Sequence, residues 1–195
     1  MFGMFGGKPN YEKIFSSKDD TYKLIYGNRS KTSSILGDNV FIDAWLSSKN
    51  TGQVTAIIES EASKGDIPSL KQMIWLCELY FEDAPNSFKD PNQLLKFQTT
   101  YMQDRIKYCR KAIDCGLKDQ AYYAMTSSAK LYNLYSRVPN AMDNQVVQLA
   151  VLGIVHYGQM FLESGTRDPQ LIKDTKDILQ HYTPMAKIAA QFAGR

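Results

Sequence analysis

The spacing of apolar residues most constrains what this chain can fold into. Apolar side chains follow one another in steps of four, three and four residues from Leu70 to Phe81, and again from Met102 to Ile113. One face of an α-helix repeats with this period, whereas strands alternate at every second residue and such alternation is scarce here. The chain is therefore predicted to be all-α. Helices are expected near residues 52–64, 67–82, 92–115, 118–136, 142–164, 168–181 and 184–193.

Glycine and proline positions predict how these helices are grouped. Gly65, Gly116 and Gly165 each separate two expected helices, and they stand 51 and 49 residues apart. A period of about 50 residues with two helices in each unit is typical of a helical-hairpin repeat. The spacing favours a short solenoid of stacked antiparallel hairpins, and an irregular helical bundle is the alternative. Further breaks are expected at residues 84–86, Asp90–Pro91, Pro139–Asn140 and Pro184.

The ends and cysteines of the chain bear on domain organisation and compartment. Residues 1–10 are rich in glycine and are expected to form a flexible tail. We expect one α-helical domain over residues 11–195, with one or two short helices within 11–47. The first residues lack the apolar run of a secretory signal. Three cysteines without a Cys-x-x-Cys pair fit the reducing cytoplasm, which is the expected location.

The least polar segment of the chain spans Asn144 to Leu162 and carries no charged side chain. Glutamines and a histidine interrupt it, so we expect the central helix of a soluble bundle, not a bilayer span, and no membrane partner. Residues 146–160 are predicted to form the most buried helix, with Leu149 and Leu152 in the core.

Two stretches of the chain carry a resemblance to a known family. Residues 61–80 and 108–135 resemble the Sel-like repeats, relatives of the tetratricopeptide repeats, and the resemblance covers residues 60–165. In that family one helix ends in aromatic-x-x-Lys-Ala-Ala-x-x-Gly and another carries a Leu-Tyr pair. The matching residues are Tyr108, Lys111, Ala112 and Gly116, with echoes at Ala62, Gly65, Leu79–Tyr80 and Leu134–Tyr135. The resemblance implies a stack of helical hairpins that binds partner proteins.

The sequence lacks the common motifs of hydrolytic and metal-assisted catalysis. The sequence has no Gly-x-Ser-x-Gly turn and no His-Glu-x-x-His pair, and its two histidines are His156 and His181. Glu78 and Glu82 share a helix face, but no Glu-x-x-His accompanies them as a di-metal site requires. We therefore expect no catalytic residue, no metal and no cofactor.

Aromatic and basic residues are the candidates for binding another protein. Tyrosine buries a large area while keeping a polar tip in water, which suits an interface. The candidate aromatic residues are Tyr122, Tyr123 and Tyr132, and the candidate basic residues are Arg105, Lys107, Arg110 and Lys111. In stacked hairpins the first helix of each unit lines one shared surface, so residues 67–82 and 118–136 are expected to lie side by side.

The functional hypothesis is a non-enzymatic protein-binding module, such as a bacterial immunity protein that neutralises a toxin, or a small adaptor. One alternative is a helical enzyme or small-ligand binder with a pocket near His156 and Tyr157 that uses Glu78 and Glu82. A second alternative is a regulator that binds nucleic acid through Arg105–Lys111, since basic residues there surround a tyrosine. The net charge of +3 does not choose among these partners.

Overall fold

A computed structural model of the chain describes residues 51–137 and 140–193. Every element in these ranges is helical, which confirms the predicted all-α class. The α-helices are α4 (Thr51–Ser63), α5 (Ile67–Ser87), α6 (Pro91–Asp114), α7 (Ala121–Tyr135), α8 (Gln145–Leu162) and α9 (Pro169–Ala193), with short 3₁₀ helices η1 (Lys118–Gln120) and η2 (Ala141–Asp143).

The chain divides into two compact units, residues 1–69 and 70–195. In the described ranges, the first unit holds α4 and the first three residues of α5, and the second holds the rest. The expected tail over residues 1–10 and the helices expected within 11–47 lie outside the described residues. The single domain expected over 11–195 stays a prediction for the same reason.

The three evenly spaced glycines end helices as predicted. Gly65, Gly116 and Gly165 follow α4, α6 and α8 with φ of 88°, 95° and 81°, a backbone region that glycine adopts without steric cost. After α6, the N–H of Leu117 donates to the carbonyl of Ala112 at 3.0 Å, and the N–H of Gly116 donates to that of Ile113 at 2.9 Å. These two bonds form a Schellman motif, which satisfies carbonyls that the helix end would leave unpaired.

Acidic and amide side chains cap the first turns of α6, α8 and α9. The Asp90 carboxylate accepts the backbone N–H of Asn92 at 2.9 Å, immediately after the break predicted at Asp90–Pro91. Asn144 does the same for α8, and Asp168 for α9. Such N-caps pair one of the backbone donors left free in the first turn, which fixes where each helix starts.

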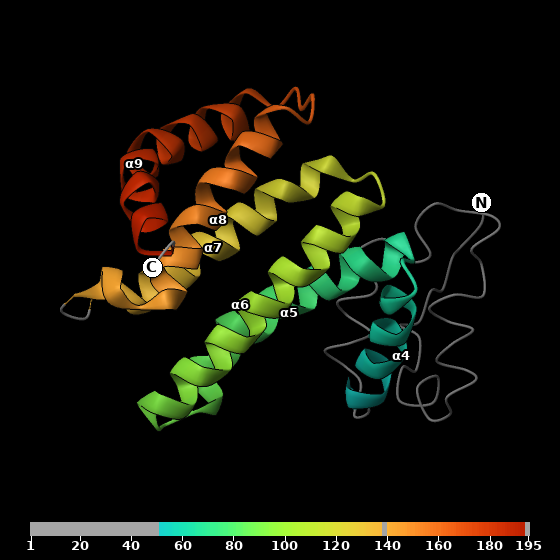
Figure 1. The fold of residues 1–195 in the computed structure, drawn as a ribbon. Coiled ribbons are helices and arrows are strands. Elements are labelled where there is room, and N and C mark those ends of the chain that lie inside the picture. Colours follow the sequence, from blue (N-terminus) through green and yellow to red (C-terminus); the bar gives the residue numbers. More distant parts are fainter. Residues whose placement is uncertain (1–50, 138–139, 194–195) are drawn as a thin grey trace, which may run out of the picture. The chain divides into compact units, whose positions relative to one another are not determined.

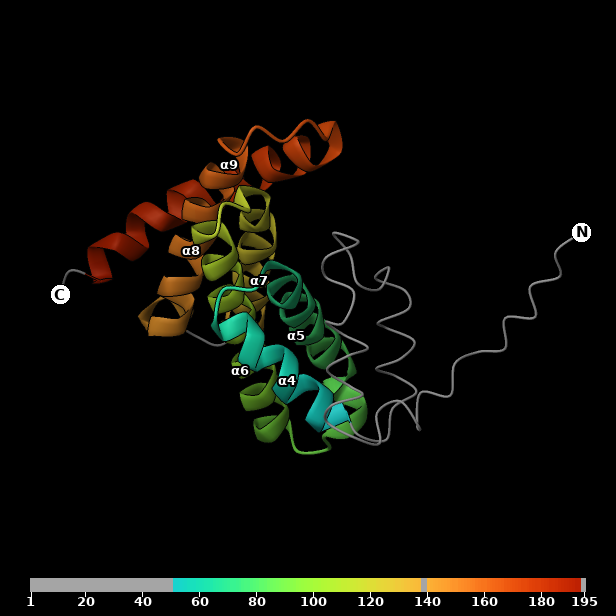
Figure 2. The same cartoon turned by 90° about the vertical axis from the view of Figure 1, so that its right-hand side faces the viewer.

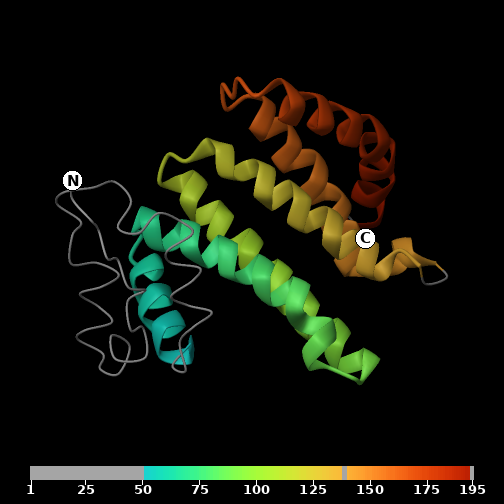
Figure 3. The same ribbon diagram turned by 180° about the vertical axis from the view of Figure 1, so that it is seen from behind.

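Two of the predicted breaks are wrong, because α5 runs through Pro85 and α9 through Pro184. A proline leaves the carbonyl four residues earlier without its helical donor. For Pro85 that carbonyl belongs to Phe81, and the side-chain amide of Gln98 on α6 donates to it at 3.4 Å. For Pro184 the carbonyl belongs to Gln180, which is exposed to water. Helix α9 accordingly bends instead of ending (Figures 1 and 3).

Successive helices of the second unit pack on one another: α6 on α7, α7 on α8, and α8 on α9 (Figures 1 and 2). The chain reverses between successive helices, so chain neighbours in this unit run antiparallel (Figures 1 and 3). One buried cluster joins α6, α7 and α8 through Met102, Leu131 and Ala150. Another joins α8 to α9 through Val147, Val151, Ala186 and Ala189.

Among the described residues, one face of α8 stays exposed, and this corrects the prediction for Leu149. That side chain is 59% exposed, on a face of α8 that it shares with His156, whereas Leu152 is half-buried against the α8–α9 cluster. By length and composition α8 is long and apolar enough to cross a membrane, and 44% of it is buried. The core helix of a soluble protein meets the same criteria.

Helices α5 and α7, and likewise α7 and α9, are in contact through residues about 50 positions apart in the chain. Lys130 of α7 bonds Glu78 and Glu82 of α5, which precede it by 52 and 48 residues. The rings of Tyr132 and Tyr182, 50 residues apart, meet edge to face at 5.2 Å between α7 and α9. The expected proximity of residues 67–82 and 118–136 is therefore present for α7 and the part of α5 in the second unit.

Candidate functional site

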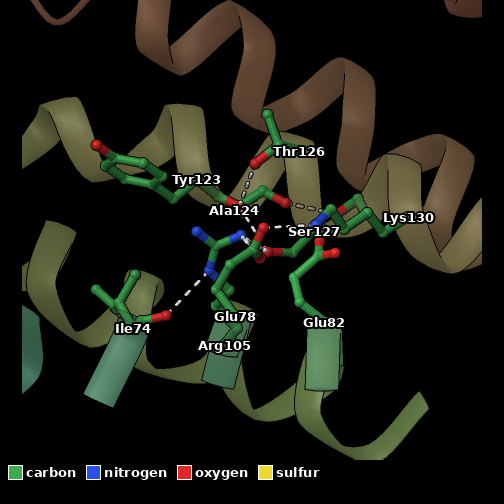
Figure 4. A network of polar contacts seen from close by, with 10 residues as sticks. Ile74, Glu78, Glu82, Arg105, Tyr123, Ala124, Thr126, Ser127 and Lys130 are labelled. Atoms are coloured by element: carbon green, nitrogen blue, oxygen red, sulfur yellow. Dashed lines mark hydrogen bonds and ion pairs between the residues drawn. The ribbon is translucent and has the colours of Figure 1, made fainter. Parts of the chain in front are cut away.

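Helices α5, α6 and α7 meet in a polar network made of Glu78, Glu82, Arg105 and Lys130 (Figure 4). Glu78 and Glu82 are four residues apart, so both carboxylates project from one face of α5. The ammonium of Lys130 on α7 lies between them, at 2.5 Å from Oε1 of Glu78 and also in contact with Glu82. The network therefore links α5 to α7, although α6 separates these two helices in the sequence.

Arg105 of α6 forms the inner end of this network, and it is only 6% exposed. Its guanidinium pairs with Oε2 of Glu78 at 2.5 Å and donates to the Ile74 carbonyl at 3.1 Å and the Ser127 hydroxyl at 3.3 Å. A buried charge without such partners lowers the stability of the fold by roughly several kcal/mol, whereas a paired charge is tolerated. Arg105 is thus not part of the exposed basic face on which the sequence analysis placed it.

Tyr123 lies where this network reaches the surface. Its side chain is 41% exposed, and its ring centroid lies 5.4 Å from the Cζ atom of Arg105 (Figure 4). The ring of Tyr122 meets it nearly at right angles, with the centroids 5.8 Å apart. An arginine over an aromatic ring is an attractive contact, so an exposed tyrosine is here held by a buried cation.

The other two candidate tyrosines pack between helices. Tyr122 is half-buried with its ring 5.2 Å from that of Phe161 on α8, and Tyr132 packs on Tyr182 of α9. Burial raises the pKa of Tyr122, and the carboxylate of Asp174 raises it further. The structure therefore separates the candidate tyrosines into Tyr123, which faces outward, and two that hold α7 to its neighbours.

The remaining basic candidates lie on the outer side of α6. Lys107 and Arg110 are exposed, and Lys111 is half-buried. The ammonium of Lys107 lies 5.6 Å from the ring centroid of Tyr108 on the same helix. Without Arg105, the exposed part of the basic cluster is smaller than the sequence suggested.

The residues of the alternative enzymatic site lie on different helices. His156 is exposed on α8 and packs edge to face on Tyr157, at 5.0 Å between ring centroids. Burial raises the pKa of Tyr157, while the nearby Arg110 lowers it. Glu78 and Glu82 bind Arg105 and Lys130 instead, and nothing in the described ranges joins them to His156. The described residues include no group of His, Cys, Asp and Glu that could hold a metal ion.

Lys130 is the member of the network that sequence reasoning missed. The signal was present, because Glu78 and Glu82 stand 52 and 48 residues before it and the glycines repeat at a similar spacing. No protein-family model, curated protein or solved structure matches this chain. The resemblance to the Sel-like repeats stays a prediction.

Proposed function

We propose that this chain is a non-enzymatic module that binds another protein through the surface around Tyr123, where α5, α6 and α7 meet. The observation that carries the proposal is the contact of an exposed aromatic ring with a buried arginine that is itself paired with Glu78. Binding energy at interfaces concentrates in a few tyrosine, tryptophan and arginine residues that are held rigidly. Tyr123 combines exposure with such support.

The helical arrangement supports the same class of function. Contacts between first helices recur at about 50 residues, and glycines with positive φ recur with them. This recurrence supports a helical-hairpin repeat, an architecture that presents neighbouring helices as one extended binding surface. Within this class we propose a small adaptor or an immunity protein that neutralises a toxin.

The experiment is capture of partners from the native host with three immobilised baits. The wild-type chain, Tyr123→Ala and Leu149→Ala are compared, because Leu149 is also exposed and apolar but lies on α8, away from the network. We expect the same protein on the wild-type and Leu149→Ala baits, and a loss of roughly tenfold or more on Tyr123→Ala. Equal capture by all three baits, with equal thermal stability, would show that the surface around Tyr123 does not bind the partner.

A further inference from the structure

We propose that Arg105 is a positioning residue: its buried guanidinium fixes the ring of Tyr123 in one orientation before any partner arrives. This inference rests on the proposed function only for what the fixed ring is used for, namely binding a partner protein. The geometry itself concerns the free protein, where Arg105 and Tyr123 belong to different helices, α6 and α7.

The guanidinium is fixed from three directions. On α5 it meets the carbonyl of Ile74 and the carboxylate of Glu78, and on α7 it meets the hydroxyl of Ser127 (Figure 4). Ser127 is itself fixed, because its hydroxyl donates to the Tyr123 carbonyl at 2.7 Å. The same serine thus connects the arginine to the backbone of the residue whose ring the arginine contacts.

Lysine could not replace this arrangement. Arginine presents several N–H donors in a planar fork and can bond three groups while its plane faces a ring, whereas an ammonium is a compact charge. Both ring contacts of Tyr123, to Arg105 and to Tyr122, come from side chains that are at least half-buried. The ring is therefore held by groups that have little freedom of their own.

An exposed side chain normally loses rotational freedom when a partner immobilises it, and this loss opposes binding. For Tyr123 the contacts with Arg105 restrict the ring in advance. Glu78 pairs with Arg105 and also with Lys130 of α7. The residue that helps to fix the ring of Tyr123 therefore also links α5 to α7. Ring orientation and helix spacing are consequently set by one network.

The first test needs no partner. 3-Fluorotyrosine is placed at position 123 alone, and its ¹⁹F resonance is recorded in the full-length chain, in Arg105→Lys and in Arg105→Met. Arg110→Met is the matched control, because Arg110 is exposed on the same helix. We expect both Arg105 variants to shift and narrow the resonance towards that of a freely rotating tyrosine, and Arg110→Met to leave it unchanged. An unchanged resonance in Arg105→Lys, with native circular dichroism, overturns the proposal.

A loss of fold in Arg105→Met does not confuse this result, because Arg105→Lys keeps the positive charge opposite Glu78. The second test uses the purified protein identified by the wild-type bait. Arg105→Lys should weaken its binding by roughly 2- to 30-fold, the range of a cation–π contact, and should have no effect in a Tyr123→Ala background. Equal weakening in both backgrounds overturns the positioning role. If Tyr123→Ala alone binds normally, the proposed binding surface fails, while the ¹⁹F result still decides whether Arg105 holds the ring.

Discussion

The position that a Cβ atom would take at Gly153 of α8 lies 2.8 Å from the Ser128 hydroxyl oxygen of α7. That hydroxyl is buried and donates to the Ala124 carbonyl at 2.9 Å, so it is not free to turn away. The close approach of α7 and α8 therefore depends on a residue without a side chain at this point. Gly158, one turn and a half further on, faces Leu179 and Met125 in the same manner.

Gly153→Ala is expected to destabilise the protein by about 1–2 kcal/mol, because the contact with Ser128 outweighs the better helix propensity of alanine. In a Ser128→Ala background the nearest obstacle is gone, and the next atoms are the Cβ of residue 128 at 3.4 Å and the Tyr157 ring at 3.8 Å, both near ordinary van der Waals contact. There Gly153→Ala should be neutral or stabilising by up to about 1 kcal/mol. Urea unfolding of the four proteins in this cycle measures both effects, and equal losses in the two backgrounds would contradict the stated contact.

Glu78→Ala should lower the free energy of unfolding by about 2–3 kcal/mol, because it removes the carboxylate that pairs with the buried Arg105. Water can enter the partly exposed site of Glu78, which limits the loss. Glu82→Ala is the matched control, because Glu82 contacts the same lysine but its side chain is 60% exposed. Its cost should stay below about 1 kcal/mol, as for other surface ion pairs. Chemical denaturation distinguishes the two, and similar losses would mean that Arg105 does not depend on Glu78.

Ile154→Ala and Leu149→Ala test which side of α8 is covered. Ile154 is fully buried, so its truncation should cost roughly 2–5 kcal/mol. Leu149 is mostly exposed, and its truncation should change stability by less than about 0.5 kcal/mol. Thermal unfolding of the two variants gives the comparison, and the reverse order would show that α8 is rotated about its axis.

Burial raises the pKa of the Cys109 thiol from 9.0 to about 12, and the nearby Arg105 only partly opposes this rise. Above the unfolded pKa, the unfolded chain releases the thiol proton while the folded chain retains it, so stability falls as the pH rises. Between about pH 8 and about pH 10, Cys109 should account for a loss of about 1 kcal/mol.

Cys109→Ala should remove this part of the alkaline decline, and Cys115→Ala, which deletes an exposed thiol, should retain it. Urea unfolding midpoints at the two pH values measure the difference. An identical decline in wild type and Cys109→Ala would assign the loss to other groups, such as the buried tyrosines.

Helix ends were predictable from the sequence wherever the residue type alone determines the backbone conformation. Gly65, Gly116 and Gly165 adopt positive φ, which needs no tertiary partner. The breaks predicted at Pro85 and Pro184 were wrong because the effect of a proline depends on whether the carbonyl four residues earlier finds another partner. For Pro85 that partner is the Gln98 side chain, which belongs to another helix.

The candidate site was predictable in part. Tyr123 stood among the proposed residues, and the neighbouring helices were expected side by side. The burial of Arg105 was not predictable, because it depends on Glu78, 27 residues earlier on a different helix. Leu149 was misplaced for a related reason: a helix that is apolar on every side does not reveal which side its neighbours cover.

The packing of α6 on α7, α7 on α8 and α8 on α9 has a consequence for how this unit folds. Contacts between chain neighbours close short loops, so little chain entropy is lost before they form, and such a pattern favours fast folding. Amide hydrogens on the exposed face of α9 should then exchange with solvent before those of α7, which packs against both α6 and α8.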